Sequence, residues 1–324
     1  MLNNILLSDY IMSWLENVKN HVDIITYEDY KQYAINHIIP YFEKKKIKLV
    51  DVTFQDIENY YNYKFTSGRL DGKPGGLALS TIRRHKVVLN LTFKKAMCEG
   101  IINNNPCEYA KLPKETNHNT VAKFYTAEQC KKLLEVTKGS VLHDMIYLTL
   151  IYGLRRSELM GLKWNAVDFD NNTITIQHTV VLQNQIVAKD KTKNKSSNRV
   201  YPLLDDVKEI LIKIRDKQQK DKKFFGKSYK NNDYIFKDVR GNEYYPSYPT
   251  HALQKTLKKN ELPHIRWHDL RHSCASMLIL KRWQIKEISD WLGHADIGTT
   301  MNIYGHLDIE HKRELGNSLN GMLN

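Results

Sequence analysis

Three separated segments of the 324-residue chain carry side chains that together could cut a phosphodiester bond. The last of them, 292–304, contains His294 and ends in Tyr304. A tyrosine phenol is a poor nucleophile near neutral pH, but it becomes reactive when cations surround the phosphate and a base takes its proton. The upstream segments 153–159 and 268–272 supply both kinds of group.

The cations and the base come from these two upstream segments. His268 and Arg271 are three residues apart in a segment, 268–280, whose pattern predicts a helix, so both project from one face and could reach one phosphate. A guanidinium is a planar fork of donors that matches the two non-bridging oxygens of a phosphodiester. A single arginine more often forms a surface salt bridge, but Arg155 and Arg271 could bracket one phosphorus atom from two helices.

The composition favours a polyanionic partner. The chain has a formal net charge of +13 and a pI near 9.3, and its lysines and arginines are spread along its length. Such a charge suits a phosphate backbone. A ribosomal or membrane-surface protein could be equally basic, so the charge alone does not choose among these classes.

Neither a metal centre nor a secreted disulfide framework is expected. The four cysteines, Cys98, Cys107, Cys130 and Cys274, have no paired metal-ligand spacing, which predicts buried free thiols in a reducing cytoplasm. The N-terminus lacks the basic start and apolar run of a signal peptide, and no stretch is apolar enough to span a bilayer. We therefore expect a cytoplasmic protein with no membrane partner.

The length suits about two domains, with a single domain as the less favoured alternative. Residues 1–107 have the pattern of helices, and Thr26 and Thr53, each three residues before a carboxylate, indicate helix starts. The polar, turn-rich stretch 108–122 predicts a linker, and 123–324 a second domain.

A long helix is predicted at about 80–99 and is stopped by Gly100. One face offers apolar residues to the core: Ile82, Leu89, Phe93, Ala96 and Met97. The other face carries four basic residues: Arg83, Arg84, Lys94 and Lys95. They could form an ordinary solvated surface, but beside the downstream segments we expect them to contact DNA.

The second domain mixes helical and strand patterns. A capping box at 126–129 opens a helix, and the apolar segment 141–152 leads to Arg155. Strands with a period of two residues are predicted at 166–176, 179–188 and 199–203, and helices resume from 206. The predicted fold class is mainly α with a small antiparallel β-sheet.

With these segments in view, the chain resembles a tyrosine recombinase of the phage integrase family. The family's first box is matched by 152–159, its second by 268–272 and its last by 292–294, with Tyr304 ten residues after His294. The resemblance covers the whole chain. It implies a two-domain, C-shaped clamp, with a helical, SAM-like core-binding domain and a mixed α/β catalytic domain, in a bacterial protein associated with the nucleoid when it acts.

The resemblance implies that Tyr304 attacks a DNA phosphodiester to give a 3′-phosphotyrosyl link and a free 5′-hydroxyl. Strands are then exchanged through a Holliday junction, and a mobile element is integrated or excised, without ATP, a metal or a cofactor. Arg155, Arg271 and His294 would stabilise charge on the phosphoryl oxygens. His268 would accept the tyrosine proton.

The family takes the proton for the leaving 5′-oxygen from a lysine on a β-hairpin turn. Counting back from 201–203 makes Lys193 that residue, whereas the Lys191-Thr192 pair imitates the family's common dipeptide. We favour Lys193 as the general acid, with a pKa depressed by neighbouring cations and desolvation. Lys191 and Lys195 would then contact DNA phosphates.

Other polar residues near the boxes receive supporting roles. Glu158 follows Arg155 by one helical turn, so it would orient that arginine or a histidine. Thr299 and Thr300 are expected to start the helix of the nucleophile, a structural role that we prefer to a catalytic one.

The resemblance also implies partners. These are double-stranded DNA recombination sites, a homo-tetramer with one dimer per site, and accessory DNA-bending or directionality factors. The amphipathic tail 305–324 could pack on its own domain, but the family commonly docks it on the neighbouring protomer. We therefore expect a cyclic exchange of tails within the tetramer.

Two alternative functions are weighed. The segment 285–294 with the helix after it also resembles a helix-turn-helix, but a DNA-binding regulator does not explain the combined boxes. A type IB topoisomerase uses similar residues, but the chain lacks an extended clamp region.

The lysine-rich turn and the insertion at 224–245 favour an integrase of a phage or conjugative transposon over a compact Xer resolvase. Whether an arm-binding domain belongs ahead of residue 1 stays open.

Overall fold

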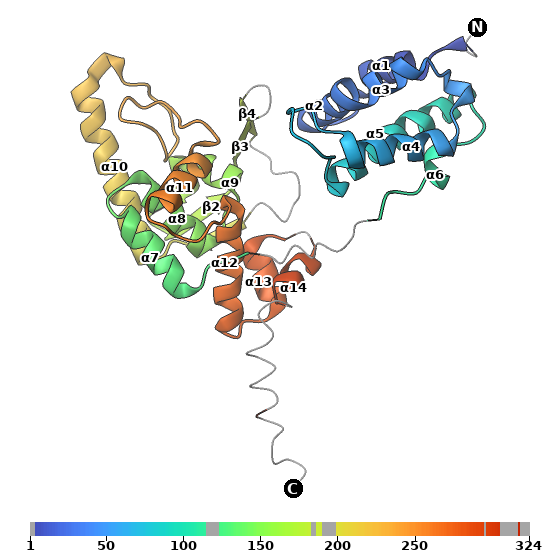
Figure 1. Ribbon diagram of the computed structural model, residues 1–324. Coiled ribbons are helices and arrows are strands. Elements are labelled where there is room, and N and C mark those ends of the chain that lie inside the picture. The colour runs from blue at the N-terminus through green and yellow to red at the C-terminus, as the bar shows by residue number, and fades with distance from the viewer. Residues whose placement is uncertain are drawn as a thin grey trace. The chain divides into compact units, whose positions relative to one another are not determined.

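The computed structural model of the protein describes residues 4–114, 123–182, 186–189, 199–294, 296–304 and 317 (Figure 1). At 182, 186, 187, 189 and 302–304 it describes the backbone alone. The chain forms two compact units, Met1–Asn119 and Thr120–Asn324, each with its own apolar core. The fold is mainly helical with small antiparallel sheets, which confirms the predicted fold class. None of the described helices is long and apolar enough to cross a lipid bilayer.

The described part of the first unit is a bundle of helices. They are α1 (Leu7–Val18), α2 (Ile24–Tyr33), the π-helical η2 (Ala34–Ile38), α3 (Ile39–Lys45), the 3₁₀ turn η3 (Leu49–Asp51), α4 (Phe54–Ser67), α5 (Leu79–Cys98) and α6 (Pro106–Tyr109). Because α5 contacts α1, α2, α4 and α6, it is the central element of this unit.

The helix α5 matches the predicted helix to within one residue at each end, and Gly100 follows it with φ +69°. Four of the five expected core residues are fully buried: Ile82, Leu89, Phe93 and Ala96. The fifth was wrong, since Met97 is 37% exposed. It lies about 100° further round the helix than Ala96 and so points away from the apolar stripe.

One of the two predicted helix starts in this unit is confirmed. Thr53 and Asp56 form a complete capping box at the start of α4. The start predicted at Thr26 was wrong, because α2 already begins at Ile24 and the side chain of Asp23 accepts a hydrogen bond from the N–H of Ile25 at 2.9 Å. An earlier carboxylate caps the helix, so Thr26 falls inside it.

Basic side chains are buried next to α5. His85 is inaccessible to solvent, and its Nδ1 lies 2.9 Å from the hydroxyl of Tyr60. The ring of His37 lies 5.0 Å away between centroids, and Lys64, 5% exposed, lies over the ring of Tyr60. Burial, with the charges of His37 and Lys64, lowers the pKa of His85 to about 3. His85 is therefore neutral in the folded unit at physiological pH.

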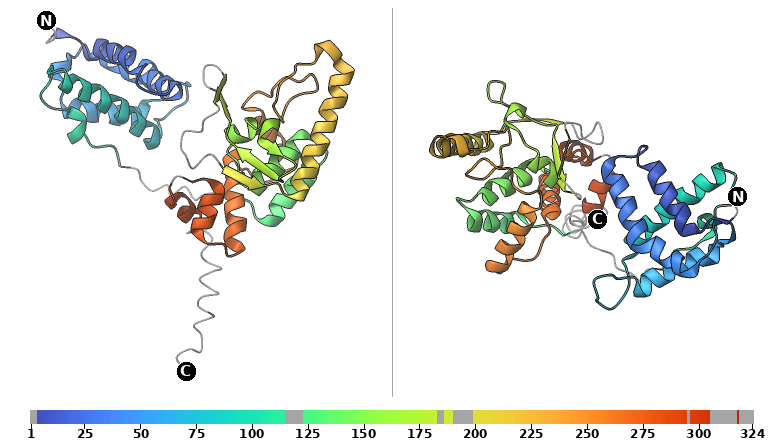
Figure 2. Two further views of the ribbon diagram at one scale, coloured as in Figure 1. Left: turned by 180° about the vertical axis from the view of Figure 1, so that it is seen from behind. Right: turned by 90° about the horizontal axis from the view of Figure 1, so that it is seen from above.

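The second unit carries the remaining elements. Its helices are α7 (Ala127–Thr137), α8 (Val141–Tyr152), α9 (Arg156–Met160), the 3₁₀ turn η4 (Trp164–Ala166), α10 (Asp205–Phe225), the 3₁₀ turn η6 (Gly226–Ser228), α11 (Tyr248–Lys259), α12 (Trp267–Leu280), α13 (Ile285–Leu292) and α14 (Gly298–Tyr304). α8 has the predicted limits, and the capping box between Thr126 and Gln129 is confirmed. α12 packs against α7, α8, α11, α13 and α14, whereas α10 runs along one side of the unit (Figure 2).

The strands of this unit form two small antiparallel sheets. They are β1 (Val167–Asp168), β2 (Thr173–Ile176), β3 (Thr179–Leu182), β4 (Ile186–Lys189) and β5 (Arg199–Pro202). β2 lies between β1 and β5, and among the described strands β3 and β4 pair with each other as a separate two-stranded sheet. In β5 the side chains of Arg199 and Tyr201 are buried, and Val200 between them is 65% exposed. The strand therefore directs an arginine inwards.

One glycine brings the ends of two helices together. Gly153, directly after α8, has φ +62°, and a Cβ added to it would lie 2.2 Å from the Leu292 side chain at the end of α13. Only glycine combines that backbone conformation with this approach. The segment before Arg155 and the segment before His294 are thus held side by side.

We expect acid to destabilise the first unit through His85. In the unfolded chain His85 titrates near its ordinary pKa of about 6.5, so below that pH the unfolded chain binds more protons than the native chain. Stability should fall as the pH drops from about 6.5 towards 3, by up to about 1.4 kcal/mol per pH unit for one histidine. Hydrogen exchange of the α5 amides, corrected for intrinsic rates, measures this loss.

His85→Gln should show a smaller loss between pH 7 and pH 5 than the wild-type chain. His251→Gln, at an exposed position of the second unit, is the matched control and should leave exchange in α5 unchanged. Equal pH dependence in the His85→Gln variant and the wild type would contradict the prediction.

Candidate active site

Arg155 lies at the start of α9 and is held from both sides. Its backbone N–H and its Nη1 donate to the two oxygens of Glu158, at 2.9 and 2.6 Å, and its Nη2 donates to the carbonyl of Gly293 at 2.8 Å. One third of its side chain, 33%, stays exposed. The predicted orienting role of Glu158 thus has a direct geometric basis, and the guanidinium keeps an accessible face.

The carboxylate of Glu158 is shared by two arginines. It is 1% exposed, and its Oε2 also accepts a hydrogen bond from Nη2 of Arg199 at 2.9 Å. Burial by itself would raise the pKa of Glu158, but the charges of Arg199 and Arg155 outweigh it and lower that pKa. The sequence interpretation missed Arg199. One feature of the sequence could have indicated it: Arg199 is two residues before Tyr201 in a predicted strand, so the two side chains lie on the same face.

Arg271 lies on α12 and is 1% exposed. Its Nη1 donates to the carbonyl of Gly153 at 2.6 Å and its Nε to Nε2 of His294 at 3.3 Å, while its Nη2 has no partner among the described residues. Burial and the charge of Arg155 lower the pKa of Arg271 to about 9, so the group remains charged at neutral pH. A buried, unpartnered N–H of a cation is a ready donor for an anion.

The hydrogen bonds of His294 define its tautomer. Because Arg271 can only donate, Nε2 of His294 accepts, so the ring proton is on Nδ1. Nδ1 lies 2.8 Å from the hydroxyl of Thr300, which is fully buried. Burial and the charges of Arg271 and Arg155 lower the pKa of His294 to about 3.

Thr300 has a different role from the predicted one. α14 begins at Gly298, whose N–H donates to the side chain of Asp296 at 2.9 Å. The hydroxyl of Thr300 is therefore not needed to start the helix, and it orients His294 instead.

His268 projects from the first turn of α12. Its ring is solvent-exposed at the edge and meets the ring of His272 edge-on, with centroids 4.8 Å apart. Desolvation and the nearby charges of His272 and Arg271 lower the pKa of His268 to about 4. The imidazole is therefore neutral near pH 7 and free to accept a proton.

Some predicted site residues are described only in part. Tyr304 is the last residue of α14, one turn after Thr300, and is described by its backbone. The three lysines of the predicted turn lie outside the described residues: Lys191, Lys193 and Lys195. The four basic residues predicted to contact DNA are exposed on α5: Arg83, Arg84, Lys94 and Lys95. Two of these have partners, Tyr33 for Arg84 at 2.9 Å and Glu99 for Lys95 at 3.1 Å.

The described residues of the site therefore combine buried guanidiniums with neutral histidines. Arg155, Arg199 and Arg271 surround one carboxylate, which leaves an excess of positive charge. No group of three or more metal-ligating side chains occurs within the described residues. Fixed guanidinium donors can bind the oxygens of a phosphate and stabilise the charge that develops there.

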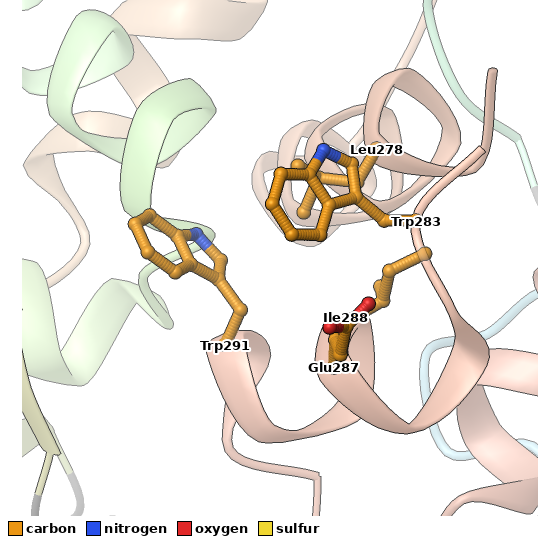
Figure 3. Close-up of a pocket in the computed structure, with 5 residues that line it drawn as sticks. All are labelled: Leu278, Trp283, Glu287, Ile288 and Trp291. Atoms are coloured by element: carbon orange, nitrogen blue, oxygen red, sulfur yellow. The ribbon is translucent and has the colours of Figure 1, made fainter. Parts of the chain in front are cut away.

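An apolar pocket opens beside this cluster, near the ends of α12 and α13. It has a volume of about 240 Å³ and is lined by Leu278, Trp283, Glu287, Ile288 and Trp291 (Figure 3). The indole rings of Trp283 and Trp291 flank it, and Trp283 is 56% exposed. Exposed aromatic surface of this kind is typical of an interaction site.

Comparison with known proteins places these observations in context. Residues 123–311 match the sequence model of the phage integrase family, and residues 6–65 match that of the phage integrase N-terminal SAM-like domain. A "Tyrosine recombinase XerC-like" protein of Caldanaerobacter subterraneus subsp. tengcongensis is 27% identical over an alignment that covers 98% of this chain and 84% of that protein.

Two further proteins are similar along most of the chain. The ICEBs1 integrase of Bacillus subtilis is 27% identical over 92% of this chain and 78% of its own length. The structure of the Tn1549 transposon integrase in complex with a circular intermediate DNA has a TM-score of 0.73 and 19% identity, and the match covers 97% of this chain and 99% of that chain. The likeness to this structure supports the fold.

We expect Glu158→Gln to destabilise the second unit. The substitution keeps the shape but removes the charge that neutralises Arg199, whose side chain is only 7% exposed. Breaking a buried ion pair by removing one partner costs about 3–5 kcal/mol. Urea unfolding of the variant and the wild-type chain measures the difference.

Glu209→Gln is the matched control, because Glu209 forms an exposed salt bridge with Lys213 at 3.5 Å. Its loss should cost about 0.5 kcal/mol or less. If the two variants lose the same stability, the buried carboxylate does not hold the site together.

Proposed function

The chain belongs to the phage integrase family and is a tyrosine-type site-specific recombinase of a mobile element, and from this premise we propose that Tyr304 is its nucleophile. The Tyr304 oxygen attacks a DNA phosphorus, the 3′-phosphate becomes an ester of the tyrosine, and the 5′-oxygen leaves as a hydroxyl. Because the ester retains the energy of the broken bond, a 5′-hydroxyl of another strand can reverse the step.

The observation that carries this proposal is a hydrogen-bonded chain from the helix of Tyr304 to a buried guanidinium. Thr300, one turn before Tyr304, bonds to His294, and His294 accepts from Arg271. The backbone that carries the nucleophile is thereby fixed to the donors that would bind the phosphate. Such fixed geometry is what converts a weak nucleophile into an effective one.

Arg155 and Arg271 would hold the non-bridging oxygens of the phosphate. The exposed face of Arg155 and the unpartnered Nη2 of Arg271 are the donors available for this. The negative charge of the DNA raises the pKa of nearby histidines. A protonated His294 would give up the bond from Arg271 to Nε2 and donate to the phosphate from that atom instead, and His268 would take the proton of the tyrosine.

The leaving 5′-oxygen needs a proton, and we propose Lys193 as its source. Lys193 belongs to the segment between β4 and β5, and β5 carries Arg199 into the site. Lys191 is the alternative within the same segment. A lysine surrounded by cations has a depressed pKa, which makes it a better acid near neutral pH.

Double-stranded DNA recombination sites are the proposed substrate. Arg83, Arg84, Lys94 and Lys95 of α5, with Lys191 and Lys195, would contact the phosphate backbone, which fixes the register of a protein on DNA without reading its sequence. The recombination would integrate or excise a mobile element through a Holliday junction, and accessory DNA-bending or directionality factors would assist.

Tyr304→Phe should abolish covalent attachment to DNA. The test is a nicked suicide substrate made from the DNA that flanks the gene, on which cleavage traps the protein because the religating strand is lost. The wild-type chain should give a covalent adduct, resistant to denaturant, that Tyr304→Phe does not form. Tyr245→Phe, at an exposed tyrosine of the same unit, is the control and should form the adduct normally. An adduct that persists with Tyr304→Phe removes Tyr304 from the role of nucleophile.

We also propose that the tail 305–324 docks in the apolar pocket of a neighbouring protomer. The pocket is lined by two tryptophans, and the tail carries apolar residues to fill it: Leu307, Ile309, Leu315, Leu319, Met322 and Leu323. Exchange of tails in this way would link four protomers on two DNA sites.

A chain that ends at Leu307 should bind single DNA sites but lose cooperative tetramer assembly. Trp283→Ala should weaken assembly in the same way because it removes one wall of the pocket. Phe224→Ala, which removes an aromatic residue 83% exposed elsewhere on the unit, should assemble normally. Sedimentation of protein–DNA complexes measures the assembly, and full cooperativity in the shortened chain contradicts the exchange.

A further inference from the structure

Arg199 is the most tightly bound side chain of the site that the proposed chemistry does not use. Its side chain is 7% exposed, its Nε donates to the hydroxyl of Tyr201 at 2.7 Å, and its Nη2 donates to Oε2 of Glu158 at 2.9 Å. Its Nη1 is buried and has no partner among the described residues. This guanidinium therefore fixes the one carboxylate on which Arg155 depends.

A second route connects Arg199 to the other anchor of Arg155. The hydroxyl of Tyr201 donates to the carbonyl of Trp291, and the two rings meet edge-on with centroids 4.8 Å apart. Trp291 lies two residues before Gly293, whose carbonyl holds Nη2 of Arg155. One anchor of Arg155 is thus bonded to β5 through Arg199, and the other lies two residues after a carbonyl that is bonded to Tyr201 of β5.

The position of Arg199 in the chain gives this arrangement a further consequence. Arg199 is the first residue of β5, opposite Ile176 of β2, and it directly follows the lysine segment 190–198. Because Arg199 donates to Glu158, the start of β5 sets the orientation of that carboxylate.

We infer that Arg199 is a positioning residue for strand cleavage: it holds Glu158 so that Arg155 presents its guanidinium to the phosphate. The inference rests on the proposed role of Arg155. Without Arg199, Oε2 of Glu158 keeps only the backbone N–H of Arg155 as a donor and becomes available to the guanidinium of Arg155 as well. A carboxylate and a guanidinium then pair bidentately, which draws the donors of Arg155 away from the phosphate.

A purely structural role for Arg199 would have a different signature. In that case Arg199 would only neutralise a buried carboxylate, so its loss would lower stability and leave the chemical step of folded protein unchanged. A positioning role slows the chemical step of protein that is folded and bound to DNA. Single-turnover cleavage of the suicide substrate at saturating protein separates the two.

Arg199→Met should slow single-turnover cleavage by about 10²-fold, the usual effect of a displacement of about 1 Å in a reacting group, with little change in the Kd for DNA. Arg199→Lys keeps the buried charge, and hence the fold, but has no planar fork, so it should recover only part of the rate. Wild-type cleavage rates in Arg199→Lys overturn the inference even if Arg199→Met fails to fold. Arg240→Met, at an exposed arginine stacked on Phe225, is the control and should cleave normally.

A double-mutant cycle tests whether Arg199 acts through Arg155. Arg155→Lys alone should be slow, and adding Arg199→Lys should slow it little further, because the group to be positioned is already gone. If the rate losses of the two single substitutions multiply in the double variant, the inference is wrong. If Arg155→Lys and Tyr304→Phe both cleave normally, the proposed function itself fails. If they are inactive and Arg199→Lys is fully active, only the role of Arg199 fails.

Discussion

The site depends on one buried ion-pair network, in which the carboxylate of Glu158 is shared by Arg155 and Arg199. A carboxylate that is 1% exposed is costly to bury unless cations satisfy both oxygens, and here each oxygen has its own guanidinium. The network joins α9 to β5 through two residues, Glu158 and Arg199, that are 41 positions apart in the sequence. Loss of Glu158 would leave the buried Arg199 unpaired, whereas loss of either arginine leaves the carboxylate with a single guanidinium.

Backbone carbonyls at helix ends do the rest of the positioning. Gly153 ends α8 and Gly293 ends α13, both with left-handed backbone, and their carbonyls accept from Arg271 and Arg155 respectively. The C-terminus of a helix carries partial negative charge, so it holds a cation without cancelling it. Carboxylate partners in these places would have neutralised the arginines. Carbonyl partners fix the geometry of both arginines without a counter-charge, although Arg155 also pairs with Glu158.

Local sequence patterns predicted the elements well where the pattern and the burial agree. The limits of α8, the capping box at Thr53 and the core face of α5 follow from short-range rules, and the spaced boxes identified the candidate residues. The positioning residues escaped, because their roles depend on pairing across the fold. In β5 the apolar Val200 faces solvent while Arg199 is buried, a reversal that hydrophobic periodicity cannot predict. Likewise Thr300 is of a residue type that is common at helix starts, and only the packing of α14 against α12 turns its hydroxyl towards His294.

The protonation states divide the site into two kinds of group. The guanidinium of Arg271 keeps its charge throughout the range from pH 5 to 8, since its pKa stays at about 9 despite burial. The pKa values of His294 and His268, about 3 and 4, keep both rings neutral until an anion arrives. The fixed positive charge of the site therefore comes from its arginines, and an anion bound beside them would raise the pKa of both histidines. On the proposed function that anion is a DNA phosphate, so the binding of DNA would itself raise the proton affinity of the two rings.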